Sequence, residues 1–290
     1  MNLLITGGNG QLGKDCETVF QKNHDITSVD IEDLDITHMD QVDALVTKIR
    51  PDIIINCAAF TRVDDCETQK EAAWQVNVTG PENLAKTARK IHSLLVHIST
   101  DYIFDGNKIP PQSYVETHIP SPLSQYGKSK LAGERAVMNN ADHYIILRTA
   151  WLYGFYGPNF LKTIVKKAIA DPATPLKIVS DQFGSPTWSF RLALQIEHLI
   201  NHKARGIYHA SSEGYCSWYE FAKYFLEKLD IAHNIAPCTT EEYPTPATRP
   251  KCVILENRHL KNEKLNIMRN WQTDLDEYLM QYGDRLVREN

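Results

Sequence analysis

One short stretch near the N-terminus decides the fold: Leu3-Leu4-Ile5-Thr6-Gly7-Gly8-Asn9-Gly10-Gln11-Leu12-Gly13. The apolar run at 3–6 predicts a buried strand, and the pattern at 10–20 predicts the helix that follows it. Gly7, Gly10 and Gly13 lie in the turn between them. The first permits a tight turn, the second lets a pyrophosphate approach backbone N–H groups, and the third lets helix and strand pack closely. The helix N-terminus adds partial positive charge. The stretch therefore predicts a dinucleotide-binding turn.

Apolar runs alternate with helical patterns through the first half of the chain. Further strands are predicted at 26–29, 53–55, 94–98 and 144–147. Further helices are predicted at 38–50, 71–77, 81–91 and 126–137. Strands that are apolar throughout and separated by helices are typical of a parallel sheet covered on both faces. We therefore expect an α/β fold with a Rossmann-type, doubly wound parallel sheet.

The regular alternation weakens after Trp151, where prolines interrupt the pattern. Later helices are predicted at 159–170, 188–202 and 217–229, and a loop is predicted at 236–250. We expect residues 1–150 to form the dinucleotide-binding domain. Residues 151–290 are expected to form mainly a smaller C-terminal, substrate-binding lobe, with some segments returning to the large sheet.

Composition and charge exclude several classes of protein. The 290 residues carry 31 basic and 36 acidic side chains, a net charge of -5, so no attraction to nucleic acid or an anionic membrane is expected. No apolar run approaches the roughly 18 residues of a membrane helix. The six scattered cysteines favour reduced thiols, and with the absence of a signal-peptide pattern they predict a cytoplasmic location. No metal site is predicted, because histidines and cysteines show no zinc-type spacing.

Asp30 ends the second predicted strand, about 20 residues beyond the glycines, where a Rossmann fold places an acid. A carboxylate there accepts hydrogen bonds from the adenosine ribose and repels a 2′-phosphate, which favours NADH. No lysine or arginine follows before Lys48, so no clamp for a 2′-phosphate is evident. Because the same acids would also suit a solvated loop, the choice between NADH and NADPH stays open here.

Tyr126 and Lys130 are four residues apart in a predicted helix, so they share one face. A lysine ammonium beside the tyrosine is expected to lower the pKa of its hydroxyl. Tyr126 would then protonate a carbonyl oxygen as hydride reaches the carbon. Thr100, just after the strand at 94–98, would hydrogen-bond that oxygen. Such a pair also occurs on ordinary polar helices, but its order after the glycine turn favours a reductive active site.

The sequence resembles the extended short-chain dehydrogenase/reductase family along nearly its whole length. Besides the glycine turn, the resemblance rests on residues 56–64, 77–80, 99–106, 126–130, 147–154 and 181–187. Two segments, Ser-Thr-Asp-Tyr-x-Phe-x-Gly at 99–106 and Asp-Gln-x-Gly-Ser-Pro-Thr at 181–187, point to its dTDP-4-dehydrorhamnose-reducing branch. This resemblance implies NADPH- or NADH-dependent reduction of the C4 ketone of dTDP-4-dehydro-L-rhamnose to dTDP-L-rhamnose.

The motifs and the resemblance together assign the site residues. The implied catalytic residues are Thr100, Tyr126 and Lys130. The implied cofactor contacts are Gly7, Gly10, Gln11, Leu12, Gly13, Asp30, Asp35, Ile36, Ala58, Ala59, Thr61, Asn77, Tyr126 and Lys130. The implied substrate contacts are Thr100, Tyr102, Phe104, Trp151, Gln182 and Arg249. The planar fork of Arg249 would neutralise a diphosphate, and Asn77 would lie beneath the active site and organise the lysine.

Other functions stay open on the same residues. A nucleotide-sugar epimerase or 4,6-dehydratase shares the scaffold, but a dehydratase usually has an Asp-Glu pair after the threonine, and this chain has Asp101-Tyr102. A non-catalytic regulatory subunit would bind a dinucleotide and a partner protein without turnover. Some members of the family bind magnesium at a dimer contact, and here Arg191 falls near one of the acidic positions used. We expect a nucleotide-sugar substrate and a monomer or homodimer.

Overall fold

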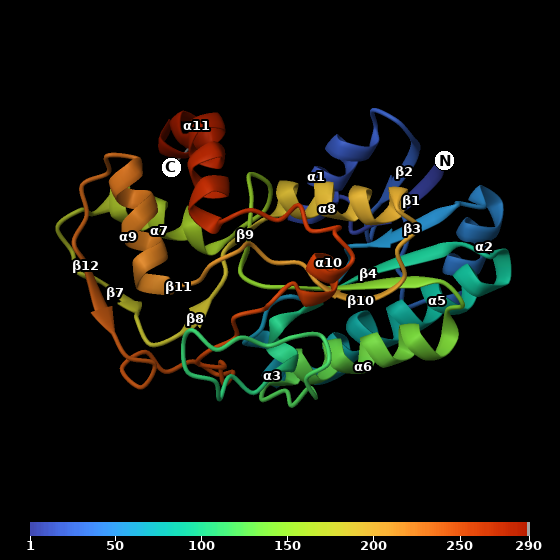
Figure 1. Cartoon of the computed structure of the whole chain (residues 1–290), viewed down its shortest axis with the longest axis horizontal. Coiled ribbons are helices and arrows are strands. Elements are labelled where there is room, and N and C mark those ends of the chain that lie inside the picture. Colours follow the sequence, from blue (N-terminus) through green and yellow to red (C-terminus); the bar gives the residue numbers. More distant parts are fainter. Residues whose placement is uncertain (289–290) are drawn as a thin grey trace.

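A six-stranded parallel sheet forms the centre of the molecule, which we describe from a computed structural model of residues 1–288 (Figure 1). Its spatial order is β10 (Gly206–His209), β5 (Tyr144–Thr149), β4 (Leu94–Thr100), β3 (Ile53–Asn56), β1 (Asn2–Thr6) and β2 (Asp25–Val29). The chain leaves β1 for β2 on one side and then continues through β3, β4 and β5 on the other. The loops leaving β1 and β3 therefore diverge, which opens a crevice at the carboxyl ends of these strands. The predicted doubly wound α/β fold is confirmed.

Helices cover both faces of the sheet (Figure 1). One face packs on α1 (Gln11–Phe20) and α8 (Ser189–Asn201). The other packs on α2 (Met39–Ile49), α5 (Gly80–Ile91) and α6 (Gln125–Asn140). Because both faces are buried, the inner strands carry consecutive apolar residues, such as Ile53 to Ile55 of β3, rather than alternating ones.

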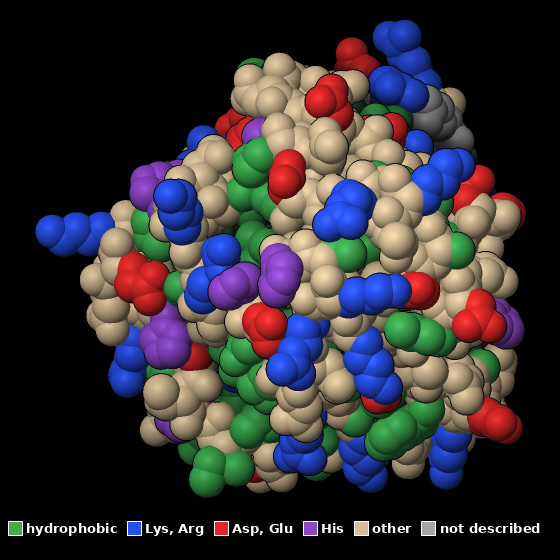
Figure 2. All heavy atoms as spheres, turned by 90° about the vertical axis from the view of Figure 1, so that its right-hand side faces the viewer, with side chains coloured by type: hydrophobic (Ala, Val, Ile, Leu, Met, Phe, Trp, Pro, Cys, Tyr) green, Lys and Arg blue, Asp and Glu red, His purple; other side chains and the backbone are tan. Residues whose placement is uncertain are grey.

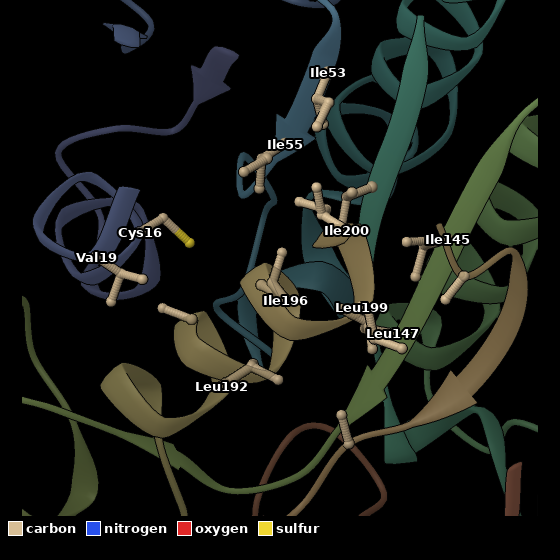
Figure 3. Packing of buried hydrophobic residues seen from close by; sticks show 14 of the residues in the cluster. Cys16, Val19, Ile53, Ile55, Ile145, Leu147, Leu192, Ile196, Leu199 and Ile200 are labelled. Atoms are coloured by element: carbon tan, nitrogen blue, oxygen red, sulfur yellow. The ribbon is translucent and has the colours of Figure 1, made fainter. Parts of the chain in front are cut away.

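Alternate residues of one strand enter different cores. Ile53 and Ile55 of β3 pack in the cluster under α1 and α8, whereas Ile54 packs in the cluster under α2 and α5. Figure 3 shows Ile55 and Leu147 on the side of the sheet that α8 covers, with Cys16 of α1 nearby. This two-sided burial holds the carboxyl ends of the strands in place, and the crevice residues lie at those ends.

A second group of elements lies beside the sheet, at the left of Figure 1. Its helices are α7 (Phe160–Ala170), α9 (Trp218–Lys228) and α11 (Trp271–Arg288). Its short strand pairs are β6 (Leu152–Tyr153) with β9 (Thr187–Trp188), β8 (Phe183–Gly184) with β11 (Cys216–Ser217), and β7 (Leu176–Val179) with β12 (Ile235–Cys238). These elements share a second core rich in aromatic side chains, among them Phe221, Phe225 and Tyr278.

Several elements differ from the sequence-based expectation. The predicted loop at 236–250 begins with strand β12, and neither α10 (Arg258–Asn262) nor α11 was predicted. The predicted helices at 71–77 and 81–91 form one nearly continuous run, in which α4 (Lys70–Trp74) passes through the π-helical turn η1 (Gln75–Thr79) into α5. Two elements from the second half of the chain return to the large sheet: β10 pairs with β5, and α8 packs on one face. The division of the chain at residue 150 stays a prediction.

The surface gives no sign of a concentrated basic patch on the face in Figure 2, where acidic and basic side chains are interspersed. Within residues 1–288, no helix combines the length and the apolar character needed to cross a membrane.

Candidate active site

A cavity of about 1190 Å³ lies at the carboxyl ends of the central strands and extends to the second group of elements. Its walls include the glycine turn, the end of β4, the first turns of α6, and side chains from α7, β7 and α9. Of the predicted cofactor contacts, all except Gly13 and Asn77 line this cavity. Of the predicted substrate contacts, all except Phe104 line it.

The glycine turn has the close approaches expected of a dinucleotide cradle. Gly7 has a φ of +68°, and a Cβ there would lie 2.6 Å from the backbone nitrogen of Ala58. A Cβ on Gly13 would collide with the carbonyl oxygen of Gly7, so this glycine lets α1 pack on the turn instead of touching a ligand. Gly10 faces the cavity, and a Cβ there would take up space beside the N-terminus of α1. These three positions fit a bound pyrophosphate.

Asp30 is held at the edge of the cavity by backbone donors. Its Oδ2 accepts from the N–H of Asn9 at 2.7 Å, and its Oδ1 accepts from the N–H of Ile31 at 2.8 Å. Asp35 and Ile36 lie on the same rim. The carboxylate of Asp35 accepts from the backbone and hydroxyl of Thr37, at 2.9 Å and 2.8 Å. Two carboxylates of the segment after β2 therefore line the cavity, and their contact with an adenosine ribose stays a prediction.

Lys130 and Tyr126 lie one helical turn apart on α6 and both face the cavity. The Lys130 Nζ donates to the carbonyl oxygen of Ile98 at 2.7 Å. Burial lowers the pKa of Lys130 to about 8, although the carboxylate of Glu134 opposes this shift. The ammonium is therefore still charged at neutral pH.

The expectation that Lys130 lowers the pKa of Tyr126 is wrong for the chain alone. Burial of the hydroxyl raises the pKa of Tyr126, and only the hydrogen bond with Thr100 opposes that rise. The physical reason is that the phenolate loses more hydration in the cavity wall than a neighbouring lysine bonded to Ile98 restores. A phenol with a raised pKa keeps its proton and is suited to donate it.

Thr100 stands between Asp101 and Tyr126 at the end of β4. Its hydroxyl donates to Asp101 Oδ1 at 2.9 Å and accepts from the N–H of Tyr102 at 3.2 Å. The ring of Tyr102 meets that of Tyr126 edge to face, with their centroids 5.5 Å apart. The structure thus brings Thr100, Tyr126 and Lys130 together on one wall.

Two predicted contacts lie behind the cavity wall. Asn77 is buried; its Oδ1 accepts from the N–H of Phe60 at 2.8 Å, and its Nδ2 donates to Ser129 Oγ at 3.0 Å. It ties the loop after β3 to α6 and reaches Lys130 only through the neighbouring Ser129. Phe104 is fully buried and stacks on Tyr114 at 4.4 Å, so it packs in a core cluster and does not face the substrate side.

The far end of the cavity is walled by a pair of tryptophans. Trp151 has a φ of +45° and stacks on Trp218 with ring centroids 3.5 Å apart and planes 7° apart. Trp218, which was not among the predicted substrate contacts, lines the cavity as well. Gln182 also lines this end and donates from Nε2 to Thr240 Oγ1 at 3.2 Å. Arg249 also lines the cavity and is held by Asp64.

The model of the RmlD substrate binding domain family matches residues 1–283. The chain belongs to this family. It is 40% identical to a dTDP-4-dehydrorhamnose reductase of Aggregatibacter actinomycetemcomitans, over 86% of this chain and 88% of that protein. The predicted family is confirmed.

Solved structures of dTDP-4-dehydrorhamnose reductases match nearly the whole length of this chain. A dTDP-4-dehydrorhamnose reductase from Clostridium acetobutylicum superposes with a TM-score of 0.94 and 41% identity. The match covers 98% of this chain and 100% of that one. One from Bacillus anthracis in complex with NADP gives a TM-score of 0.93 and 40% identity, covering 97% of this chain and 99% of that one. The match to the RmlD family model therefore runs from the glycine turn into α11.

Sequence reasoning missed some residues that this RmlD-family cavity contains. Lys167 of α7 and Lys177 of β7 line it, and neither was among the predicted contacts. Asp101 lines it as well, and its only signal in the sequence was its place between Thr100 and Tyr102. Arg191, near a position where some relatives were expected to carry an acid, has its Nε 3.1 Å from Oδ1 of the buried Asp274.

Proposed function

We propose that this chain uses NADPH or NADH to reduce the C4 ketone of dTDP-4-dehydro-L-rhamnose, giving dTDP-L-rhamnose. One observation carries the proposal: Thr100, Tyr126 and Lys130 face the same cavity as the glycine turn. Membership of the RmlD family, and the reductases among its relatives, support the same reaction. The nicotinamide, when bound, supplies a hydride to the ketone carbon.

The residues of the chain supply the proton and hold the reacting groups. Hydride addition at C4 turns the ketone oxygen into an alkoxide, which takes the proton from the Tyr126 hydroxyl. The raised pKa of Tyr126, caused by burial, keeps that proton in place until the alkoxide forms. The resulting phenolate is stabilised by the Thr100 hydroxyl, the group that opposes the rise in the pKa of Tyr126. Lys130, which points from α6 toward the end of β4, would also hold the nicotinamide ribose.

The second group of elements would bind the nucleotide sugar. Trp151 and Trp218 offer a flat apolar wall for the base or the sugar. Arg249 lines the same cavity, and its guanidinium would meet the diphosphate there. We also propose that the protein acts in the cytoplasm as a monomer or homodimer.

The test is direct turnover. Purified protein, given dTDP-4-dehydro-L-rhamnose and each cofactor in turn, should consume NADH or NADPH, followed by absorbance at 340 nm. NMR of the product should show hydride at C4 with the rhamno configuration. A folded protein that binds cofactor and oxidises neither form would remove the reductase and favour the regulatory-subunit alternative. A C6-deoxygenated product from dTDP-glucose would favour the dehydratase instead.

A further inference from the structure

Asp101 is a buried acid that the reaction described above does not use. It follows β4 directly, is 2% exposed and contributes to the cavity wall. Its Oδ1 accepts from the Thr100 hydroxyl at 2.9 Å. Its Oδ2 has no hydrogen-bond partner among the residues that the structure describes. A buried carboxyl oxygen with no partner is costly unless the group is neutral or has a role in the site.

The hydrogen bonds of Thr100 can be counted. A hydroxyl has one proton and two lone pairs. The Oγ1 of Thr100 has three polar neighbours: the N–H of Tyr102, Oδ1 of Asp101 and the hydroxyl of Tyr126. The N–H of Tyr102 can only donate, so it uses one lone pair. The single proton of Thr100 therefore points either at Asp101 or at the side of Tyr126 and the ketone.

The protonation state of Asp101 decides between these two directions. An ionised carboxylate only accepts, so it takes the Thr100 proton and leaves the phenolate of Tyr126 without that donor. A neutral carboxyl group can donate to Thr100, and the Thr100 hydroxyl then turns toward Tyr126. Because the Thr100 hydroxyl has only one proton, it cannot donate to Asp101 and to Tyr126 at the same time.

We propose that Asp101, in its neutral form, is a positioning residue that donates to Thr100 and thereby aims the Thr100 hydroxyl at the reacting oxygen. This rests on the proposed reductase function. Thr100 then donates to the ketone oxygen as negative charge forms on it, and afterwards to the phenolate of Tyr126. No bond to Asp101 breaks in this role, and its proton stays on its carboxyl group.

The surroundings of Asp101 suit this role. Burial raises the pKa of Asp101 to about 7, and the hydrogen bond from Thr100 opposes the rise. Both forms are therefore populated near neutral pH, and the neutral form gains as the pH falls. The titratable and charged groups around Thr100 and Asp101 are Tyr102, Tyr126, Cys66, Lys130, Asp64 and Arg249. The phenols and the thiol are neutral at this pH, and Asp64 and Arg249 neutralise each other in an ion pair.

The experiment compares kcat against pH, at saturating substrate and cofactor, for the wild type, Asp101→Asn and Asp101→Ala. The wild type should lose about tenfold in kcat as Asp101 ionises between pH 6 and pH 8. Asp101→Asn cannot ionise, so its kcat should change less than about twofold over that range. Asp101→Ala removes the donor and should lower kcat by about tenfold to hundredfold at pH 6. In a Thr100→Val background, Asp101→Asn should leave the shape of the pH profile unchanged.

A second readout needs neither cofactor nor substrate. The infrared difference spectrum of the apo protein between pH 6 and pH 8 should contain a carboxyl band that Asp101→Asn removes, with unchanged circular dichroism. A pH profile of Asp101→Asn that follows the wild type, or an infrared spectrum identical in both proteins, would overturn the positioning role. Absence of turnover by the wild type at every pH would instead refute the reductase function, and the infrared result would still decide the state of Asp101.

Discussion

Asp64 and Arg249 lie 185 residues apart in the chain, yet their side chains form a two-pronged ion pair, with Nη1 3.0 Å from Oδ1 and Nη2 2.9 Å from Oδ2. The pKa of Asp64 is lowered, first of all by the hydrogen bond from Arg249. Both side chains are partly exposed, so the pair adds about 1 kcal/mol or less to stability. Its consequence is geometric, because it fixes the guanidinium of Arg249 in the wall of the cavity.

Arg249→Lys should weaken substrate binding more than it slows chemistry. A lysine keeps the charge but loses the planar fork, so it cannot hold Asp64 with two bonds and also meet a diphosphate. We expect the KM for the nucleotide sugar to rise by about tenfold, with kcat and the cofactor KM within about threefold. Arg89→Lys is the matched control, since Arg89 pairs with Asp142 and does not line the cavity. A cofactor KM that rises as much as the substrate KM would contradict this assignment.

Tyr126→Phe tests the proton donor. Phenylalanine keeps the ring that meets Tyr102 edge to face but has no proton to give. We expect kcat to fall by about 10²-fold or more, while the cofactor Kd, measured by fluorescence titration, stays nearly constant. Tyr144→Phe, on β5 and away from the cavity, should change neither quantity. Turnover that survives in Tyr126→Phe would assign the proton to another group.

The parts of the site that follow one local segment were predictable from the sequence. The glycine turn needs only a strand, three glycines and a helix, and the spacing of Tyr126 and Lys130 needs only one helix. Strands buried on both faces were equally visible, because Ile53 to Ile55 must be apolar on either side. These features depend on neighbours within a few residues.

The features that sequence reasoning missed depend on contacts between distant segments. Trp218 stacks on Trp151, and Arg249 forms an ion pair with Asp64. Each contact joins segments that are far apart in the sequence and come together only when the chain folds. The rise in the pKa of Tyr126 depends on burial, which the spacing to Lys130 does not reveal. Strand β12 contains Pro237, and a proline in that stretch favoured a loop. In the structure β12 is an edge strand of a two-stranded sheet with β7, and an edge strand tolerates a proline because one of its sides forms no backbone hydrogen bonds to a neighbouring strand.

Asp30→Asn should shift the cofactor preference toward NADPH. The amide keeps the shape of the side chain, but it no longer repels a 2′-phosphate. We expect the ratio of kcat/KM for NADPH to that for NADH to rise by about tenfold. Asp33→Asn is the control, because Asp33 lies three residues on in the same loop and does not line the cavity. An equal ratio in wild type and Asp30→Asn would place the adenosine ribose elsewhere.

Lys130→Met should stabilise the apo protein at neutral pH. Folded Lys130 has a pKa of about 8, lowered from 10.5 by burial, so below pH 8 the fold carries a poorly hydrated charge. Between pH 8 and pH 10.5 the unfolded chain binds more protons at this residue than the folded chain, so its contribution to stability rises with pH.

The expected free energy of unfolding of Lys130→Met at pH 7 is about 1–3 kcal/mol above that of the wild type. The gap should narrow as the pH rises toward 10, and turnover should be lost. Urea unfolding of both proteins across this pH range measures the difference in their free energies of unfolding. The thiols and phenols that also titrate in this range are the same in both proteins, so their contributions drop out of the difference. Lys128→Met, an exposed neighbour on the same helix, should show no such gap. A Lys130→Met protein no more stable than the wild type would contradict the burial of the charge.

Gly184→Ala should displace Trp151 without touching the cofactor end of the cavity. A Cβ on Gly184 would lie 2.5 Å from Cε2 of Trp151, too close for both to keep their places. Trp151 already has a φ of +45° and is backed by Trp218, so its ring has to leave the stack. We expect the substrate KM to rise by about tenfold, with the cofactor Kd within about twofold. Gly283→Ala places the same methyl group inside α11, 3.0 Å from the flexible end of Leu229, and should change neither constant. If Gly184→Ala binds the nucleotide sugar as the wild type does, the tryptophan pair is a packing feature, and the substrate meets another wall of the cavity.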